Sequence, residues 1–218
     1  MPDTIPSMPP LSAASGRRLA GVAGIGLMLF IVELLAGVAS GSQALTADAL
    51  DFLAAAVTLG LSFGLAGRPA SVQAAAVLVK DMVLVVMGVW TGVVTLYRFL
   101  LDLVPIAEVM GAVGLLALAA NLGILYLLRD DLAGATPRRE SVRARNDSIG
   151  NVTLLIAAGL VGLLGTGKPD LVVAGVMVVL YLAATVPALL ASWRHWQELR
   201  DGLLDPVAAP EHSQETRP

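Results

Sequence analysis

Residues 19–40 read LAGVAGIGLMLFIVELLAGVAS, an apolar run with one acidic side chain, Glu33, inside it. A helix needs roughly 20 apolar residues to cross the hydrocarbon core of a bilayer, and this run is long enough. Arg17 and Arg18 precede it, as basic residues precede the apolar core of a signal peptide or a twin-arginine signal. Because the run is too long for such a core and contains a charge, we predict a first transmembrane helix here.

The rest of the chain repeats this pattern. Of its 218 residues, 56% are hydrophobic and only 14% are charged, whereas charged residues make up about a quarter of a soluble domain. The mean hydropathy is +0.79. Gly, Pro and charged residues separate the apolar runs, as is typical of helix ends. We expect five further spans, at residues 43–65, 72–97, 106–128, 147–164 and 171–193.

The sequence thus predicts an all-α integral membrane protein with six transmembrane helices within residues 17–197. Segments 1–16 and 198–218 are rich in Pro and polar residues and are expected to be disordered. Six spans use about 120 residues, which leaves about 98 for ends and loops and no room for a large soluble domain.

Basic residues near the spans predict the orientation, because they concentrate on the cytoplasmic side. With the N-terminus inside, the cytoplasmic side holds eleven of them and the opposite side only Arg98 and Lys168. Both termini are therefore expected to be cytoplasmic, in the cell (inner) membrane. The eleven are Arg17, Arg18, Arg68, Arg129, Arg138, Arg139, Arg143, Arg145, Arg194, Arg200 and Arg217.

Several classes of function are excluded by what the sequence lacks. There is no cysteine, and the only histidines are His195 and His212, beyond the expected spans. Thiolate sites, a bis-histidine haem and the His-Glu-x-x-His motif of zinc proteases are therefore excluded. The net charge of −3 does not favour a nucleic-acid partner. We predict that the chain is not an enzyme and has no resident cofactor.

Acidic residues inside a span are candidates for function because an ionised side chain is costly in a membrane. Asp48 and Asp51 in the second expected helix lie about 60° apart on one face. Two such carboxylates must be protonated, paired with a cation or bound to a metal ion. Alternatively they mark a water-exposed helix start, since the span begins only a few residues earlier.

The fifth expected helix begins with a second polar cluster. Asp147 and Asn151 are four residues apart and share a face, with Arg143 one turn earlier and Asn146 adjacent. The alternative interpretation is that Asp147 is an N-cap that initiates the helix. In the third helix, adjacent Lys80 and Asp81 point about 100° apart. Each is expected to form an ion pair with another helix, and Glu33 either handles protons or pairs with Lys80.

Five segments in chain order resemble the cation diffusion facilitator (cation efflux) family. The resemblance spans residues 16–197 and is to a divergent, short member without that family's C-terminal cytoplasmic domain. The segments are residues 41–51 (GSQALTADALD), 79–82 with 96–100 (VKDM, LYRFL), 120–129 (ANLGILYLLR), 141–152 (SVRARNDSIGNV) and 168–173 (KPDLVV).

The resemblance implies a tetrahedral metal site with two ligands four residues apart on each of the second and fifth helices. The matching positions are Asp51, Ala55, Arg143 and Asp147, so two of the four offer no ligand. Four N, O or S ligands suit Zn²⁺. The expected metal ligands are therefore Asp51 and Asp147, with the shell completed by water or by Asp48, Asn146 and Asn151.

The function implied is a secondary transporter that exports divalent cations of the zinc, cobalt and cadmium class in exchange for protons. Its partners are the cation, protons and the lipid bilayer, and the family resemblance implies a homodimer. The alternative, motivated by Ala55 and Arg143, is a non-transporting relative that associates with and regulates a competent transporter.

Overall fold

Six helices form the part of the chain that the computed structural model describes, residues 13–101, 103–132 and 134–204. Each is long and apolar enough to span a membrane, which confirms the predicted all-α fold and identifies an integral membrane protein. Segments 1–12 and 205–218, where most of the expected disorder falls, lie outside the described residues. The helices are α1 (Ala13–Ser40), α2 (Gln43–Gly64), α3 (Ala70–Leu101), α4 (Ala107–Leu128), α5 (Ala135–Leu164) and α6 (Lys168–Leu204).

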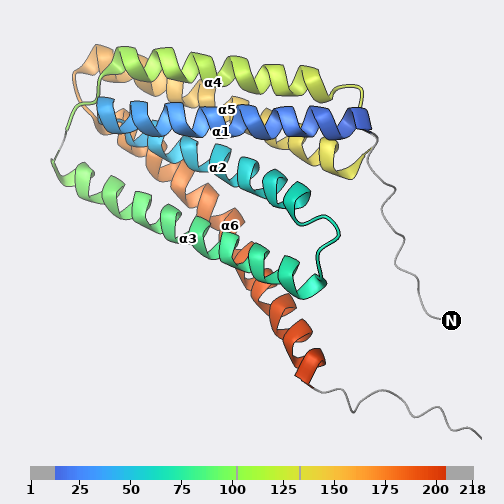
Figure 1. The fold of residues 1–218 in the computed structure, drawn as a ribbon. Coiled ribbons are helices and arrows are strands. Elements are labelled where there is room, and N and C mark those ends of the chain that lie inside the picture. Colours follow the sequence, from blue (N-terminus) through green and yellow to red (C-terminus); the bar gives the residue numbers. More distant parts are fainter. Residues whose placement is uncertain (1–12, 102, 133, 205–218) are drawn as a thin grey trace, which may run out of the picture.

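The helices pack in pairs around α2. α1 packs against α2, α4 against α5 and α3 against α6, and α2 contacts all five other helices. Figure 1 shows α3 and α6 diverging from the remaining four toward the end of the molecule where α1 begins and α6 ends. The three turns α1–α2, α3–α4 and α5–α6 lie together at the opposite end (Figure 1). We call these the terminal side and the turn side.

Four helices are longer than the apolar pattern predicts. α1 begins at Ala13, inside the segment 1–16 that is expected to be disordered, α3 continues to Leu101, and α5 and α6 are extended the most. α5 begins at Ala135, twelve residues before the expected start at Asp147, so the charged segment before Asp147 is helical rather than a loop. α6 continues to Leu204, into the segment expected to be disordered. Both extensions are polar, and hydropathy therefore does not reveal them. Asp147 consequently lies well inside α5, and its interpretation as an N-cap is wrong.

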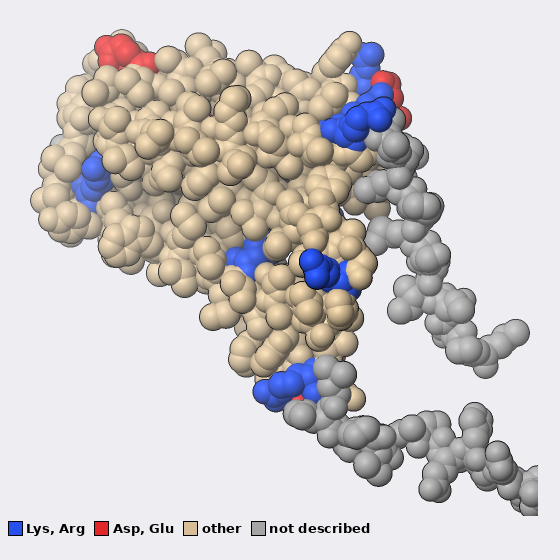
Figure 2. Space-filling model, viewed as in Figure 1, with Lys and Arg blue, Asp and Glu red and all other residues tan. Residues whose placement is uncertain are grey.

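The outer surface is apolar, as lipid contact requires. Leu35, Trp90, Leu100 and Leu163 are among many large hydrophobic side chains that are exposed, and Figure 2 shows a face formed mostly by uncharged residues. By contrast, most of α2 is buried, including its polar residues Gln43 and Asp48. Polar groups therefore face the interior of the bundle rather than lipid.

Asp170, in the first turn of α6, fixes the start of α2. Its carboxylate accepts hydrogen bonds from the Ser42 hydroxyl at 2.6 Å and from the backbone N–H groups of Gln43 at 2.8 Å and Ala44 at 3.1 Å. Ser42 also caps α2 by accepting a bond from the N–H of Leu45. The unpaired N–H groups of the first helical turn are thus satisfied by a buried charge, which holds α2 and α6 in register.

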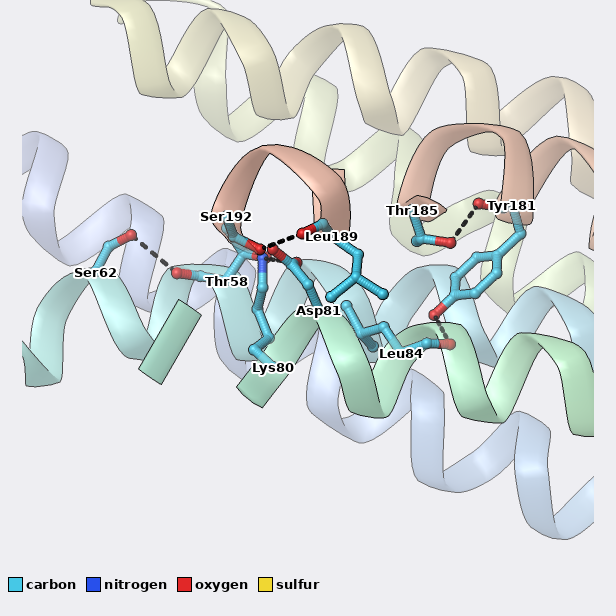
Figure 3. A network of polar contacts seen from close by, with 9 residues as sticks. All are labelled: Thr58, Ser62, Lys80, Asp81, Leu84, Tyr181, Thr185, Leu189 and Ser192. Atoms are coloured by element: carbon cyan, nitrogen blue, oxygen red, sulfur yellow. Dashed lines mark hydrogen bonds and ion pairs between the residues drawn. The ribbon is translucent and has the colours of Figure 1, made fainter. Parts of the chain in front are cut away.

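Contacts within α3 and between α3 and α6 are drawn in Figure 3. Lys80 and Asp81 form an ion pair with each other at 2.8 Å (Figure 3), so the expectation of separate pairs with other helices is wrong. Two flexible side chains can meet although their Cα–Cβ bonds diverge. Because Lys80 is paired with Asp81, it is not the partner of Glu33. A separate contact joins α3 to α6, in which the Tyr181 hydroxyl donates a hydrogen bond to the carbonyl of Leu84 at 3.3 Å.

Candidate functional site

A cavity of about 600 Å³ lies between α2, α5 and α6. Four of the five predicted ligands line it: Asp48 and Asp51 from α2, and Asn146 and Asp147 from α5. The remaining wall is largely apolar and comes from α5 and α6, including Met177 and Tyr181. The structure therefore brings the acidic residues of the second and fifth helices to one space between these helices and α6, whose outer wall includes exposed side chains such as Leu180.

Arg143 lies between the two central carboxylates. Its guanidinium is 3.6 Å from Asp147 and 4.0 Å from Asp51, and it also donates a hydrogen bond to the backbone carbonyl of Asp51. The contact to Asp147 spans one helical turn of α5, whereas the contact to Asp51 joins α5 to α2. A positive charge is thus held where two carboxylates from different helices approach each other.

The four positions singled out by the family resemblance converge. Ala55, Arg143 and Asp147 line a narrow crevice beside the cavity, and Asp51 contacts Arg143. The crevice also contains Glu140 and Asn121, and it lies toward the terminal side. Its volume of about 10 Å³ has room for about one water molecule. The methyl group of Ala55 offers no ligand at this point.

The space continues in the other direction, toward the turn side. A second cavity, of about 420 Å³, shares Thr153, Val172 and Val173 with the first and extends to Thr166 and Lys168 at the α5–α6 turn. The carboxylates therefore lie at the inner end of two adjoining cavities. On the terminal side, the crevice at Arg143 is nearly closed.

Asp48 is part of a buried pair of acids. Glu33 of α1 lies close to it, and the two side chains are almost fully buried, at 1% exposure for Asp48 and 0% for Glu33. No nitrogen or hydroxyl donor among the described residues bonds to either carboxyl group. Two ionised carboxyl groups placed in this way would have neither a donor nor a cation to compensate their burial. The interpretation of Asp48 as a water-exposed helix start is wrong.

The two asparagines have different environments. Asn146 lines the cavity, whereas Asn151 is absent from its wall and is fully buried. The amide of Asn151 donates to the carbonyl of Asp147, one turn earlier, at 3.0 Å, and its own side-chain oxygen has no partner among the described residues. Asn151 therefore supports the helix behind the site in this arrangement.

The chemistry available in the cavity is that of carboxylate and amide oxygens. Within the described residues, no three His, Cys, Asp or Glu side chains are grouped so that they could hold a metal ion. A cation between Asp51 and Asp147 would take further ligands from Asn146, backbone carbonyls or water, as hard oxygen-ligated cations do. It would also meet the guanidinium of Arg143.

Glu140 and Tyr181 were not among the predicted site residues. Glu140 belongs to the polar extension of α5, and Tyr181 faces the cavity only because of how α6 packs.

Comparison of the sequence with models of known families and with curated proteins finds no match. Function is therefore inferred from the cavity and its side chains.

Proposed function

We propose that this protein is a secondary transporter that exports a divalent cation of the zinc, cobalt or cadmium class in exchange for protons. The observation that carries the proposal is the meeting of Asp48, Asp51 and Asp147 in one cavity within a bundle of six candidate membrane spans. Acidic residues at membrane depth commonly mark ion pathways and proton relays. The chain would then be a divergent member of the cation diffusion facilitator family.

Exchange follows from the chemistry of buried carboxyl groups. A carboxylate must be deprotonated to bind a metal ion, and in an apolar surrounding it regains a proton when the ion leaves. The same side chains thereby couple the two fluxes. With both termini in the cytoplasm, in the cell (inner) membrane, the adjoining cavities face outward and the crevice at Arg143 faces the cytoplasm. Movement of α2 and α5 against the other helices would open the opposite side.

The proposal also includes a homodimer in the lipid bilayer and no enzymatic or nucleic-acid-binding role. The exposed apolar side chains of α3 and α6, such as Trp90 and Leu180, support lipid or subunit contact.

The test is cation uptake into proteoliposomes that contain the purified full chain. A pH gradient, acidic inside, is imposed across their membrane. Zn²⁺ or Cd²⁺ uptake is followed with an enclosed metal-sensitive dye. We expect uptake by the wild type and a loss of at least about tenfold for Asp51→Asn and Asp147→Asn. The matched control is Asp130→Asn, an exposed acid at the end of α4. Full uptake by both site variants, or none by the wild type, would contradict the proposal.

A second candidate is a non-transporting relative that associates with a competent transporter. The observation that favours it is the pairing of Arg143 with both Asp51 and Asp147, which already satisfies the carboxylates. In that case the wild type binds no Zn²⁺, Co²⁺ or Cd²⁺ by calorimetry, whereas Ala55→Asp restores binding. Micromolar affinity of the isolated wild-type chain would argue against this candidate.

A further inference from the structure

The role of Arg143 deepens the proposed function and rests on it. Arg143 is on α5, between Asp51 and Asp147, with its charge 4.0 and 3.6 Å from their oxygens. A guanidinium stays protonated at any pH that proteins meet. Asp51 and Asp147 are therefore always accompanied by a positive charge that is part of the protein itself, the guanidinium of Arg143.

A further acidic residue, Glu140, lies in the same crevice as this guanidinium. Glu140 lies one turn before Arg143 on α5. Glu140 is 6% exposed, so it too lies in surroundings where a charge needs a partner. Helical side chains incline toward the N-terminus of their helix, which is the direction of Glu140.

We propose that Arg143 is a tethered counter-cation that holds the cargo position between Asp51 and Asp147 and transfers to Glu140 when a divalent cation binds. In the unloaded state the guanidinium occupies the crevice on the terminal side, where no hydrated cation fits beside it. Cargo arriving through the larger cavity displaces it, and Glu140 receives it.

The charges balance for a divalent cation. In their ionised forms Asp51, Asp147, Glu140 and Arg143 carry a net charge of about −2, because three carboxylates face one guanidinium. A divalent cation neutralises this group, with the metal on the aspartates and Arg143 on Glu140. A monovalent cation balances these four groups only if one carboxyl group also takes up a proton. The charge of the four groups therefore matches that of a divalent cation.

The experiment is titration calorimetry of the purified full chain in detergent micelles with ZnCl₂ or CdCl₂. We expect Arg143→Gln to bind the metal at least about tenfold more tightly than the wild type, because no tethered cation competes; charge-assisted contacts of this kind are worth about tenfold or more. A merely structural role of Arg143 would weaken binding instead. The control is Arg145→Gln, an exposed arginine two positions along the same helix, which should change the affinity by less than about twofold.

Glu140→Gln tests the transfer. In the wild-type background it should weaken metal binding by about tenfold. In the Arg143→Gln background it should leave the metal affinity nearly unchanged, since Glu140 acts through Arg143. Equal effects of Glu140→Gln in both backgrounds would overturn the transfer, and no gain of affinity in Arg143→Gln would overturn the tethered cation.

The outcomes separate this inference from the transport proposal. A wild type that transports while Arg143→Gln binds no more tightly refutes only the role of Arg143. A wild type that does not transport, together with tight binding by Arg143→Gln, supports a tethered cation that is never released. Absence of binding in both refutes both proposals.

Discussion

Replacing Asp170 should destabilise the protein strongly, because one carboxylate satisfies three buried donors. Alanine would leave the Ser42 hydroxyl and the N–H groups of Gln43 and Ala44 without their acceptor. Each unsatisfied buried donor costs about 1 kcal/mol or more. Asp170 is 1% exposed, so water cannot readily replace it. We expect Asp170→Ala to lower the free energy of unfolding by about 3 kcal/mol or more.

Asparagine at position 170 gives a graded comparison. Its side-chain oxygen can still accept, but its NH₂ group must face one of the donors and the charge-assisted component is lost. We expect Asp170→Asn to cost about 1–2 kcal/mol. The assay is equilibrium unfolding of the purified chain in mixed detergent micelles by added SDS, followed by circular dichroism.

The matched control is Asp201→Ala, an exposed acid near the end of α6 whose one ion pair within the described part of the chain is with its neighbour Arg200. Such surface pairs contribute little, so its unfolding free energy should stay within about 0.5 kcal/mol of the wild type. Our reasoning about the α2–α6 joint fails if Asp170→Ala resembles Asp201→Ala, or if the asparagine and alanine variants are equal.

Further predictions concern packing and the ion pair of α3, each measured by the same unfolding assay. Gly37→Ala should destabilise α1 against α2 by about 1–3 kcal/mol, because a Cβ there would lie 3.0 Å from the Thr46 nitrogen and 3.1 Å from the Ser42 carbonyl oxygen. Gly60→Ala meets nothing within 4 Å and should be neutral or slightly stabilising. Lys80→Met leaves Asp81, 4% exposed, without its cation and should cost about 3 kcal/mol. The double variant Lys80→Met, Asp81→Leu should recover most of that loss, because it leaves no buried charge unpaired. If the double variant is no more stable than Lys80→Met, the loss does not come from the unpaired Asp81 carboxylate. Tyr181→Phe removes one hydrogen bond to Leu84 and should cost about 0.6 kcal/mol, the average for such bonds between membrane helices.

The fold could be predicted because apolar runs of about 20 residues have few alternatives to membrane spans. The start of α5 and the end of α6 could not, because their polar residues form helix without the apolar pattern on which the prediction relied. Helical spacing correctly placed Asp48 and Asp51 on a common side of α2. It also placed Asn151 beside Asp147, yet the amide of Asn151 bonds to the backbone of its own helix and lies away from the cavity.

The contacts of Arg143 show where sequence stops being informative. Its ion pair with Asp147 follows from their spacing on α5, but the contact with Asp51 depends on how α5 is rotated against α2. The same holds for Glu33 and Asp48, which meet across α1 and α2. Charges separated widely in the sequence are brought together only by the packing of whole helices.

The burial of α2 among all five other helices has a consequence for how the protein is made. A segment carrying Gln43, Asp48 and Asp51 has a polar side that lipid solvates poorly, and its partners α5 and α6 are synthesised much later. The helix synthesised directly before α2 is α1, and Glu33 of α1 lies beside Asp48. α2 is therefore expected to leave the translocon as a hairpin with α1, and nascent chains that lack α1 should fail to integrate it.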